Sequence, residues 1–304
     1  MAHSPRLQRA SDFAPEVLHL FDQYVHGLID RRGFLDGAAR YATAGVSAAG
    51  LLAALSPRFA QAQQVSPSDA RIRAESIEIS SPQGYGKLRG LLVRPRSQGS
   101  ERLPAVLVVH ENRGLNPHIE DIARRLAIAN FIAFAPDALT PFDGYPGNED
   151  EARELFAQLD SGKTREDFVA AARFMKALAG SNGRLGALGF CWGGGVVNML
   201  ATRVSELDAG VPFYGPAPAL DAVPTIHAEL LLHFAQDDER VNAGWPAYEA
   251  ALKAAQVRYT AYSYPGTQHG FNNDTTPRYD DAAARLAWQR TLAFLNRTLR
   301  ARSG

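Results

Sequence analysis

Residues 185–194 read LGALGFCWGG, and they decide the fold because they join a buried strand to a helix through one sharp turn. The mostly apolar run 185–190 is typical of a parallel strand buried on both faces. The apolar residues of 196–200 predict a helix. Cys191 falls at the corner, and Gly189 and Gly193 on either side allow close backbone approach. The pattern predicts a nucleophile elbow that carries Cys where Ser is usual.

The same stretch has a plainer interpretation, in which a Gly-rich turn only connects strand to helix around an inert, buried Cys. In the elbow interpretation, by contrast, the Cys is reactive. The N-terminus of the following helix contributes positive potential, which favours a thiolate and a developing oxyanion. Partner residues further along the chain decide between the two.

An acid and a histidine follow the elbow in the order that a nucleophile–acid–histidine triad requires. The apolar run 230–235 predicts a buried strand that ends at Asp237 and Asp238. A second strand, over 260–264, leads to a loop that contains His269. Either acid could merely cap a solvated turn, and His269 alone could be a surface residue. All three groups beyond strand ends, in this order, predict a triad of Cys191, His269 and Asp238 or Asp237.

The triad predicts nucleophilic acyl transfer. A free thiol has a pKa of ~8.5, which a nearby imidazolium and a helix N-terminus lower. His269 accepts the thiol proton, and the acid fixes its orientation. The thiolate then attacks an ester or lactone carbonyl. Backbone N–H groups of Trp192 and of Asn112, which follows the strand 105–109, are the expected oxyanion donors.

At these motifs the chain resembles the dienelactone hydrolases, a cysteine branch of the α/β-hydrolase fold, over roughly residues 75 to 300. The resemblance rests on 110–114 (HENRG), 135–137 (APD), 189–194 (GFCWGG), 213–215 (FYG), Asp238 and 269–271 (HGF). It implies that Asp238, not Asp237, is the acid. It also implies that Glu111 contacts the resting thiol and releases it as thiolate when substrate arrives.

One departure concerns the substrate. Asn273 stands where the resemblance implies an Arg that grips the substrate carboxylate. Arg153, in a predicted helix, is a candidate for the missing positive charge. The other candidate substrate-binding residues, in or beside the catalytic loops, are Arg113, Phe142, Tyr145, Tyr214 and Phe271. The resemblance supports the fold and the nucleophile better than it supports a dienelactone substrate.

Bulk composition excludes several classes of protein. The 304 residues carry 32 basic and 32 acidic side chains, so nothing favours a nucleic-acid partner. No Walker loop, dinucleotide-binding glycine pattern or zinc-spaced Cys/His cluster is present. We therefore expect no cofactor and no metal. A single Cys excludes an intramolecular disulfide.

The N-terminus resembles a twin-arginine export signal. Arg31 and Arg32 precede a weakly apolar stretch, 38–55, which is too short and polar for a stable membrane span. Residues 59–62 (FAQA) match a signal-peptidase site. We expect recognition by the twin-arginine export machinery and a periplasmic or secreted location. The alternative is a helical arm that packs on the domain of a cytoplasmic protein.

The expected organisation is an arm at 1–62, a linker at 63–74 and a catalytic domain at 75–304. An antiparallel pair (76–79, 88–93) leads into alternating strands and helices, which predict an α/β-hydrolase fold: a mostly parallel sheet of about eight strands with helices on both faces. The predicted function is cofactor-independent hydrolysis of a small lactone or carboxylic ester through an acyl-cysteine. The alternatives are a promiscuous esterase or thioesterase and a non-catalytic binding scaffold.

Overall fold

The structure is a computed structural model that describes residues 9–43, 45–96 and 102–300. Its strands are β1 (Ile72–Ser81), β2 (Gly86–Pro95), β3 (Leu103–Val109), β4 (Ile132–Pro136), β5 (Ser181–Phe190), β6 (Ala209–Phe213), β7 (Glu229–Asp237) and β8 (Tyr259–Gln268). Its α-helices are α1 (Pro15–Val25), α2 (Arg31–Ala38), α3 (Ala48–Leu55), α4 (Phe59–Ala62), α5 (Pro117–Ile128), α6 (Glu149–Phe156), α7 (Ser161–Lys176), α8 (Trp192–Arg203), α9 (Glu239–Asn242), α10 (Trp245–Ala254) and α11 (Asp281–Arg300).

The eight strands form one sheet in the order β1-β2-β4-β3-β5-β6-β7-β8. β1 pairs with β2, and β2 with β4, in antiparallel fashion, whereas every later pairing is parallel. Strands β3 and β5 lie at the centre of the sheet. β3 and the second part of β5, residues 185–190, are buried, so their sequences are mostly apolar. The predicted fold class and the leading antiparallel pair are confirmed.

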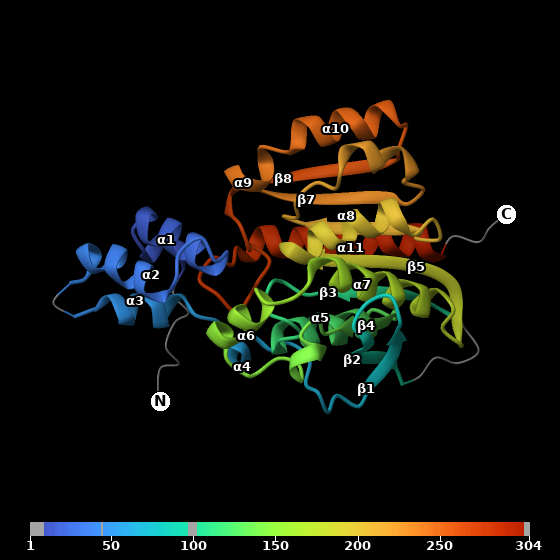
Figure 1. Ribbon diagram of the computed structural model, residues 1–304, viewed down its shortest axis with the longest axis horizontal. Coiled ribbons are helices and arrows are strands. Elements are labelled where there is room, and N and C mark those ends of the chain that lie inside the picture. The colour runs from blue at the N-terminus through green and yellow to red at the C-terminus, as the bar shows by residue number, and fades with distance from the viewer. Residues whose placement is uncertain (1–8, 44, 97–101, 301–304) are drawn as a thin grey trace.

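Helices cover both faces of the sheet (Figure 1). Helices α7, α8 and α10 contribute to the apolar core on one face, and α5 and α11 contribute to the core on the other. The carboxyl ends of the parallel strands are left for loops, and the residue after β5 is Cys191. This edge is where an open α/β sheet places its site.

Helices α1, α2 and α3 form a separate unit, residues 9–57, which we call the N-terminal module, whereas the short helix α4 that follows contacts α5. The module lies beside the main body (Figure 1) and has its own apolar cluster, which includes Phe21, Phe34 and Leu55. The predicted linker is packed rather than free: Val65 is buried, and its N–H and that of Gln64 donate to Asp121. β1 begins within the predicted linker, at residue 72. No helix of the described residues is long and apolar enough to cross a membrane.

Candidate active site

Cys191 occupies a strained corner between β5 and α8. Its φ of 55° and ψ of −117° lie outside the regions that L-residues usually adopt. A Cβ added to Gly189 would lie 2.2 Å from the carbonyl oxygen of Gly193, and one added to Gly193 would lie 2.4 Å from that of His110. Only glycine fits at both positions, so the sequence pattern around the Cys reflects a steric requirement of this turn.

His269 and Asp238 form a buried pair close to the thiol. His269 follows β8, and its Nδ1 lies 2.5 Å from Oδ2 of Asp238, which follows β7. The Asp238 carboxylate also accepts from the N–H of Val241 at 3.3 Å, because it caps helix α9. Asp237 is exposed and lies in the β7–β8 register opposite Gln268. The structure thus brings Asp238 to His269, which leaves the Nε2 of His269 for the thiol.

The charges around Cys191 change the pKa of its thiol. Burial favours the neutral thiol, but the charge of His269 and the hydrogen bond and charge of His26 outweigh it and lower the Cys191 pKa to about 5. Burial likewise disfavours a charged His269, yet the thiolate and Asp238 raise its pKa to about 10. The favoured form at neutral pH is therefore a thiolate beside an imidazolium, the state of an activated cysteine nucleophile.

Glu111, from the loop after β3, lines the same small cavity as the thiol. Its Oε2 accepts a hydrogen bond from Nδ2 of Asn273 at 3.1 Å. The residue that takes the place of the expected Arg therefore binds Glu111. Contact between Glu111 and the thiol stays a prediction.

The N-terminal module closes the cavity over Cys191. The cavity has a volume of about 60 Å³ and is lined by the catalytic loops and, from the module, by Phe21, Tyr24, Val25, His26, Ser56 and Pro57. One water occupies about 30 Å³ in the liquid, so this space holds water but no lactone or ester of ordinary size. Substrate entry therefore requires the module or the facing loops to move.

His26, the residue after α1, was missed by the sequence reasoning. Its Nε2 lies 3.6 Å from Sγ of Cys191. The local signal was Asp22 four residues earlier on a periodic helix, which places a carboxylate within reach of the imidazole. Nothing in that pattern links the helix to a thiol 165 residues away.

Two of the candidate substrate-binding residues bind backbone carbonyls at the end of α1 in the N-terminal module. Arg113 lines the cavity, and its Nη2 donates to the carbonyl of Val25 at 2.9 Å. Arg153 donates to the carbonyl of Tyr24 at 2.8 Å and stacks over the Tyr24 ring. Arg153 was a candidate for a positive charge that binds the substrate, but in the structure it does not line the cavity at Cys191 and its contacts hold the end of α1.

The aromatic candidates lie around the small cavity and not on its surface. Tyr214 and Phe271 are fully buried, and their rings pack against each other because both fill the core beneath His269. Tyr145 donates its hydroxyl to Glu149 at 2.9 Å. Phe142 ends a short 3-10 turn, Thr140–Phe142. In this closed arrangement none of the four lines the cavity at Cys191.

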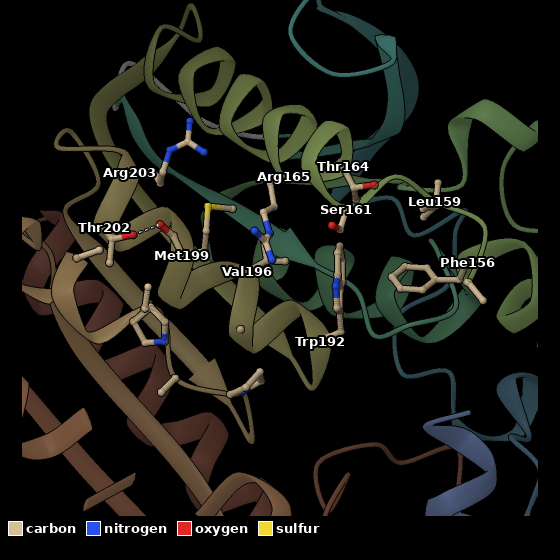
Figure 2. Close-up of a pocket in the computed structure, with 17 residues that line it drawn as sticks. Phe156, Leu159, Ser161, Thr164, Arg165, Trp192, Val196, Met199, Thr202 and Arg203 are labelled. Carbon is tan, nitrogen blue, oxygen red and sulfur yellow. Dashed lines mark hydrogen bonds between the residues drawn. The ribbon is translucent and has the colours of Figure 1, made fainter. Parts of the chain in front are cut away.

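The backbone N–H of Trp192 lies near the thiol, whereas its side chain lines a different pocket. Its N–H starts helix α8, where no intrahelical acceptor is available, so it can face an oxyanion at the thiol. The indole lies in a separate pocket of about 630 Å³ between α7 and α8, beside Phe156 (Figure 2). The side chain of Asn112, the other expected donor residue, binds the carbonyl of Val25 at 2.9 Å.

The donor atoms of His26, Cys191 and His269 lie within 4.8 Å of one another, the one such group that the described residues form. The hydrogen bonds fit proton transfer better than metal ligation. Nε2 of His26 also accepts from Nη2 of Arg240 at 2.8 Å, and the positive charge of this guanidinium disfavours a metal ion at the same place. We derive no step through a metal.

Two family models match the chain. The dienelactone hydrolase family matches residues 88–299, and a YqhI-like family matches residues 5–43. The chain is 53% identical over 115 residues to the "Putative hydrolase fragment YghX" of Escherichia coli K12, covering 38% of this chain and 97% of that one. It is 32% identical over 219 residues to the "Probable 2-oxo-3-(5-oxofuran-2-ylidene)propanoate lactonase" of Bradyrhizobium, covering 67% of this chain and 87% of that one.

A comparison with solved structures also finds a dienelactone hydrolase. The chain is similar to the structure titled "Putative Dienelactone Hydrolase" from Klebsiella pneumoniae, with a TM-score of 0.63 and 28% identity over 73% of this chain and 97% of that one. The family match covers β3 to β8, the elbow and the loops that hold the buried His269–Asp238 pair. The chain is a hydrolase of the ester- and lactone-cleaving class, and it belongs to the dienelactone hydrolase family.

Proposed function

We propose that this protein hydrolyses a small lactone or carboxylic ester through an acyl-cysteine intermediate, with Cys191, His269 and Asp238 as its triad. The observation that carries the proposal is the lone Cys at a strained strand–helix corner beside a buried His–Asp pair. A binding scaffold would have no use for the strained backbone or for a thiol whose pKa is lowered to about 5.

Acylation begins from the thiolate–imidazolium pair. The sulfur attacks the carbonyl carbon, a C–S bond forms, and the carbonyl oxygen becomes an oxyanion held by the N–H groups of Trp192 and Asn112. Collapse breaks the C–O bond to the leaving oxygen, which takes the proton from Nε2 of His269. In a lactone the leaving oxygen stays on the acyl chain, so the ring opens without release of a fragment.

Deacylation uses the same groups in reverse. His269, now neutral, removes a proton from water, which attacks the thioester carbonyl. The C–S bond breaks, the sulfur leaves as thiolate, and His269 keeps the proton. The net change is addition of one water across the ester bond. Asp238 keeps Nδ1 of His269 protonated and so presents Nε2 for both transfers.

The choice between lactone and ester depends on the charge of the site. Asn273 binds Glu111 where the family resemblance implies a carboxylate-binding Arg. This favours a substrate whose acyl part carries no carboxylate there, and it supports the second candidate, an esterase or thioesterase without lactone preference. To choose between the two, kcat/KM is measured for small aromatic lactones and for p-nitrophenyl and thioester substrates, each with and without a carboxylate.

The variant Cys191→Ala tests the nucleophile. It should abolish turnover of every substrate in the panel while the thermal transition stays cooperative. Trapping the wild-type reaction with acid should give an intact mass increased by the acyl group. Turnover by Cys191→Ala at the wild-type rate would overturn the proposal.

Twin-arginine export and a periplasmic location remain our proposal for the compartment, with the cytoplasm as the alternative. Cleavage after Ala62 would remove the N-terminal module and with it His26. The N-terminal residue of the protein in each cellular fraction decides between the two.

A further inference from the structure

The N-terminal module brings a second histidine to the sulfur. Nε2 of His26 lies 3.6 Å from Sγ of Cys191, and the His26 and His269 rings meet edge to face with centroids 4.8 Å apart. Nε2 of His269, by contrast, is buried and has no hydrogen-bond partner in the described structure. In this closed arrangement the hydrogen bond of the thiol therefore goes to the module.

Asp22 orients the imidazole of His26, as Asp238 orients that of His269. Its Nδ1 donates to the backbone carbonyl of Asp22 at 2.7 Å and lies 3.3 Å from the Asp22 carboxylate. Asp22 is in turn 3.3 Å from Nη1 of Arg278. The side chain of His26 is only 10% exposed, so these contacts fix the tautomer and present Nε2 to the sulfur.

The main body holds the end of α1 by its carbonyl groups. The last carbonyls of a helix lack intrahelical partners. Here the carbonyl of Tyr24 accepts from Arg153 at 2.8 Å, and that of Val25 accepts from Asn112 and Arg113, each at 2.9 Å. Cationic donors at a helix C-terminus also complement its dipole. The position of His26 is thus set by charge-assisted bonds to loops of the catalytic domain.

We propose that His26 is a second acid–base histidine of this active site, exchanging a proton with the sulfur of Cys191 while the module is docked. The S–H bond breaks, the proton moves to Nε2 of His26, and the products are a thiolate and an imidazolium whose Nδ1–H stays on Asp22. His269, as the imidazolium described above, carries its own proton on Nε2, and that proton stays available for the leaving oxygen. The proposal rests on the function proposed above, since it concerns the same thiol.

Several charges decide how readily His26 takes the proton. The groups that face its ring are Asp22 on its own helix, Cys191 at the start of α8, Arg240 of α9, His269 and Arg278 after β8, and Glu111 after β3. The carboxylate of Asp22 favours the imidazolium. The guanidinium of Arg240 donates to the same Nε2 and opposes it, but Arg240 is exposed and can exchange that bond for water.

The test uses the full chain with His26→Gln, which keeps a polar group of similar reach but cannot carry the proton. The matched control is His19→Gln, the same change on the same helix at an exposed position. The readouts are the pH profile of Cys191 alkylation and the pH profile of kcat/KM. We expect His26→Gln to raise the alkylation midpoint by about one pH unit and to lower kcat/KM near pH 7 by about tenfold.

Asp22→Asn should give a smaller shift in the same direction, because it weakens the orienting contact and keeps the imidazole. Limited proteolysis of each variant reports whether the module stays docked. A His26→Gln protein with a docked module and the wild-type midpoint would overturn the proposal. So would a faster alkylation without a shift, which would mean that His26 only covers the thiol. Cys191→Ala tests the hydrolase function itself, so the two failures are distinguishable.

Discussion

The ionisation of Cys191 gives the sharpest test of the site, because this is the only thiol in the chain. Iodoacetamide alkylation followed by intact mass therefore reports a single atom. The matched control is the same protein unfolded in guanidinium, where the thiol titrates at its ordinary pKa of ~8.5. Both profiles are measured from pH 5 to pH 10.

The expected magnitude follows from the lowered pKa of about 5. At pH 6 an ordinary thiol is about 0.3% thiolate, whereas one with the lowered pKa is about 90% ionised, a ratio of roughly 300. A thiolate of lower pKa is also intrinsically less nucleophilic, which for this shift costs roughly 25- to 50-fold. The native protein should therefore react about tenfold faster than the unfolded chain at pH 6, before any shielding by the closed cavity.

Because shielding scales all rates together, the shape of the profile is the decisive result. The native rate should be nearly flat from pH 6 to pH 9, while the unfolded rate rises roughly 240-fold over that range. A native profile that rises between pH 8 and pH 9, parallel to that of the unfolded chain, would refute the thiolate–imidazolium pair. Adding a small aromatic lactone then tests Glu111: a rate raised by the ligand would support its role in releasing the thiolate.

Further predictions concern the dyad, the elbow and the N-terminus. Asp238→Asn should lower kcat by about 10²- to 10⁴-fold because His269 loses its orienting acceptor, whereas the exposed Asp237→Asn should change it little. Gly193→Ala should reduce the free energy of unfolding in urea by about 1–3 kcal/mol, because the new methyl group meets backbone carbonyls at 2.4 and 2.5 Å. A cooperative transition at the wild-type midpoint would contradict that steric account. If the export prediction is right, periplasmic protein should begin at Gln63; full-length protein confined to the cytoplasm would refute it.

Local sequence patterns predicted most of the catalytic domain. The turn at Cys191 needs glycine two residues away on either side for steric reasons, and such a requirement is visible in any single sequence. β3 and residues 185–190 of β5 are mostly apolar because they are buried on both faces. The order of nucleophile, acid and histidine placed Asp238 and His269 beyond strand ends, where the structure brings them into contact.

The first 62 residues fit two interpretations, an export signal and a packed helical arm, which local patterns alone do not separate. An apolar, Ala-rich stretch after two arginines resembles a signal. In the structure the same residues form helices whose buried side chains, among them Phe34, Leu52 and Leu55, pack on one another. Arg31, one of the two arginines, lies 3.0 Å from Asp150 of α6. Composition does not distinguish a helix that faces a receptor from one that faces its own chain.

The sequence by itself determined the fold class, and it named the proposed nucleophile and the order of its proposed partners, because each depends on residue type and spacing within a short segment. Only the tertiary structure decided what surrounds the thiol. In the structure His26 lies at the sulfur of Cys191, and Arg153 donates a hydrogen bond to the carbonyl of Tyr24. The cavity at Cys191 has a volume of only about 60 Å³. These outcomes depend on contacts between segments more than a hundred residues apart. Such contacts are set by which surfaces fit when the chain is folded, and no local period or motif encodes them.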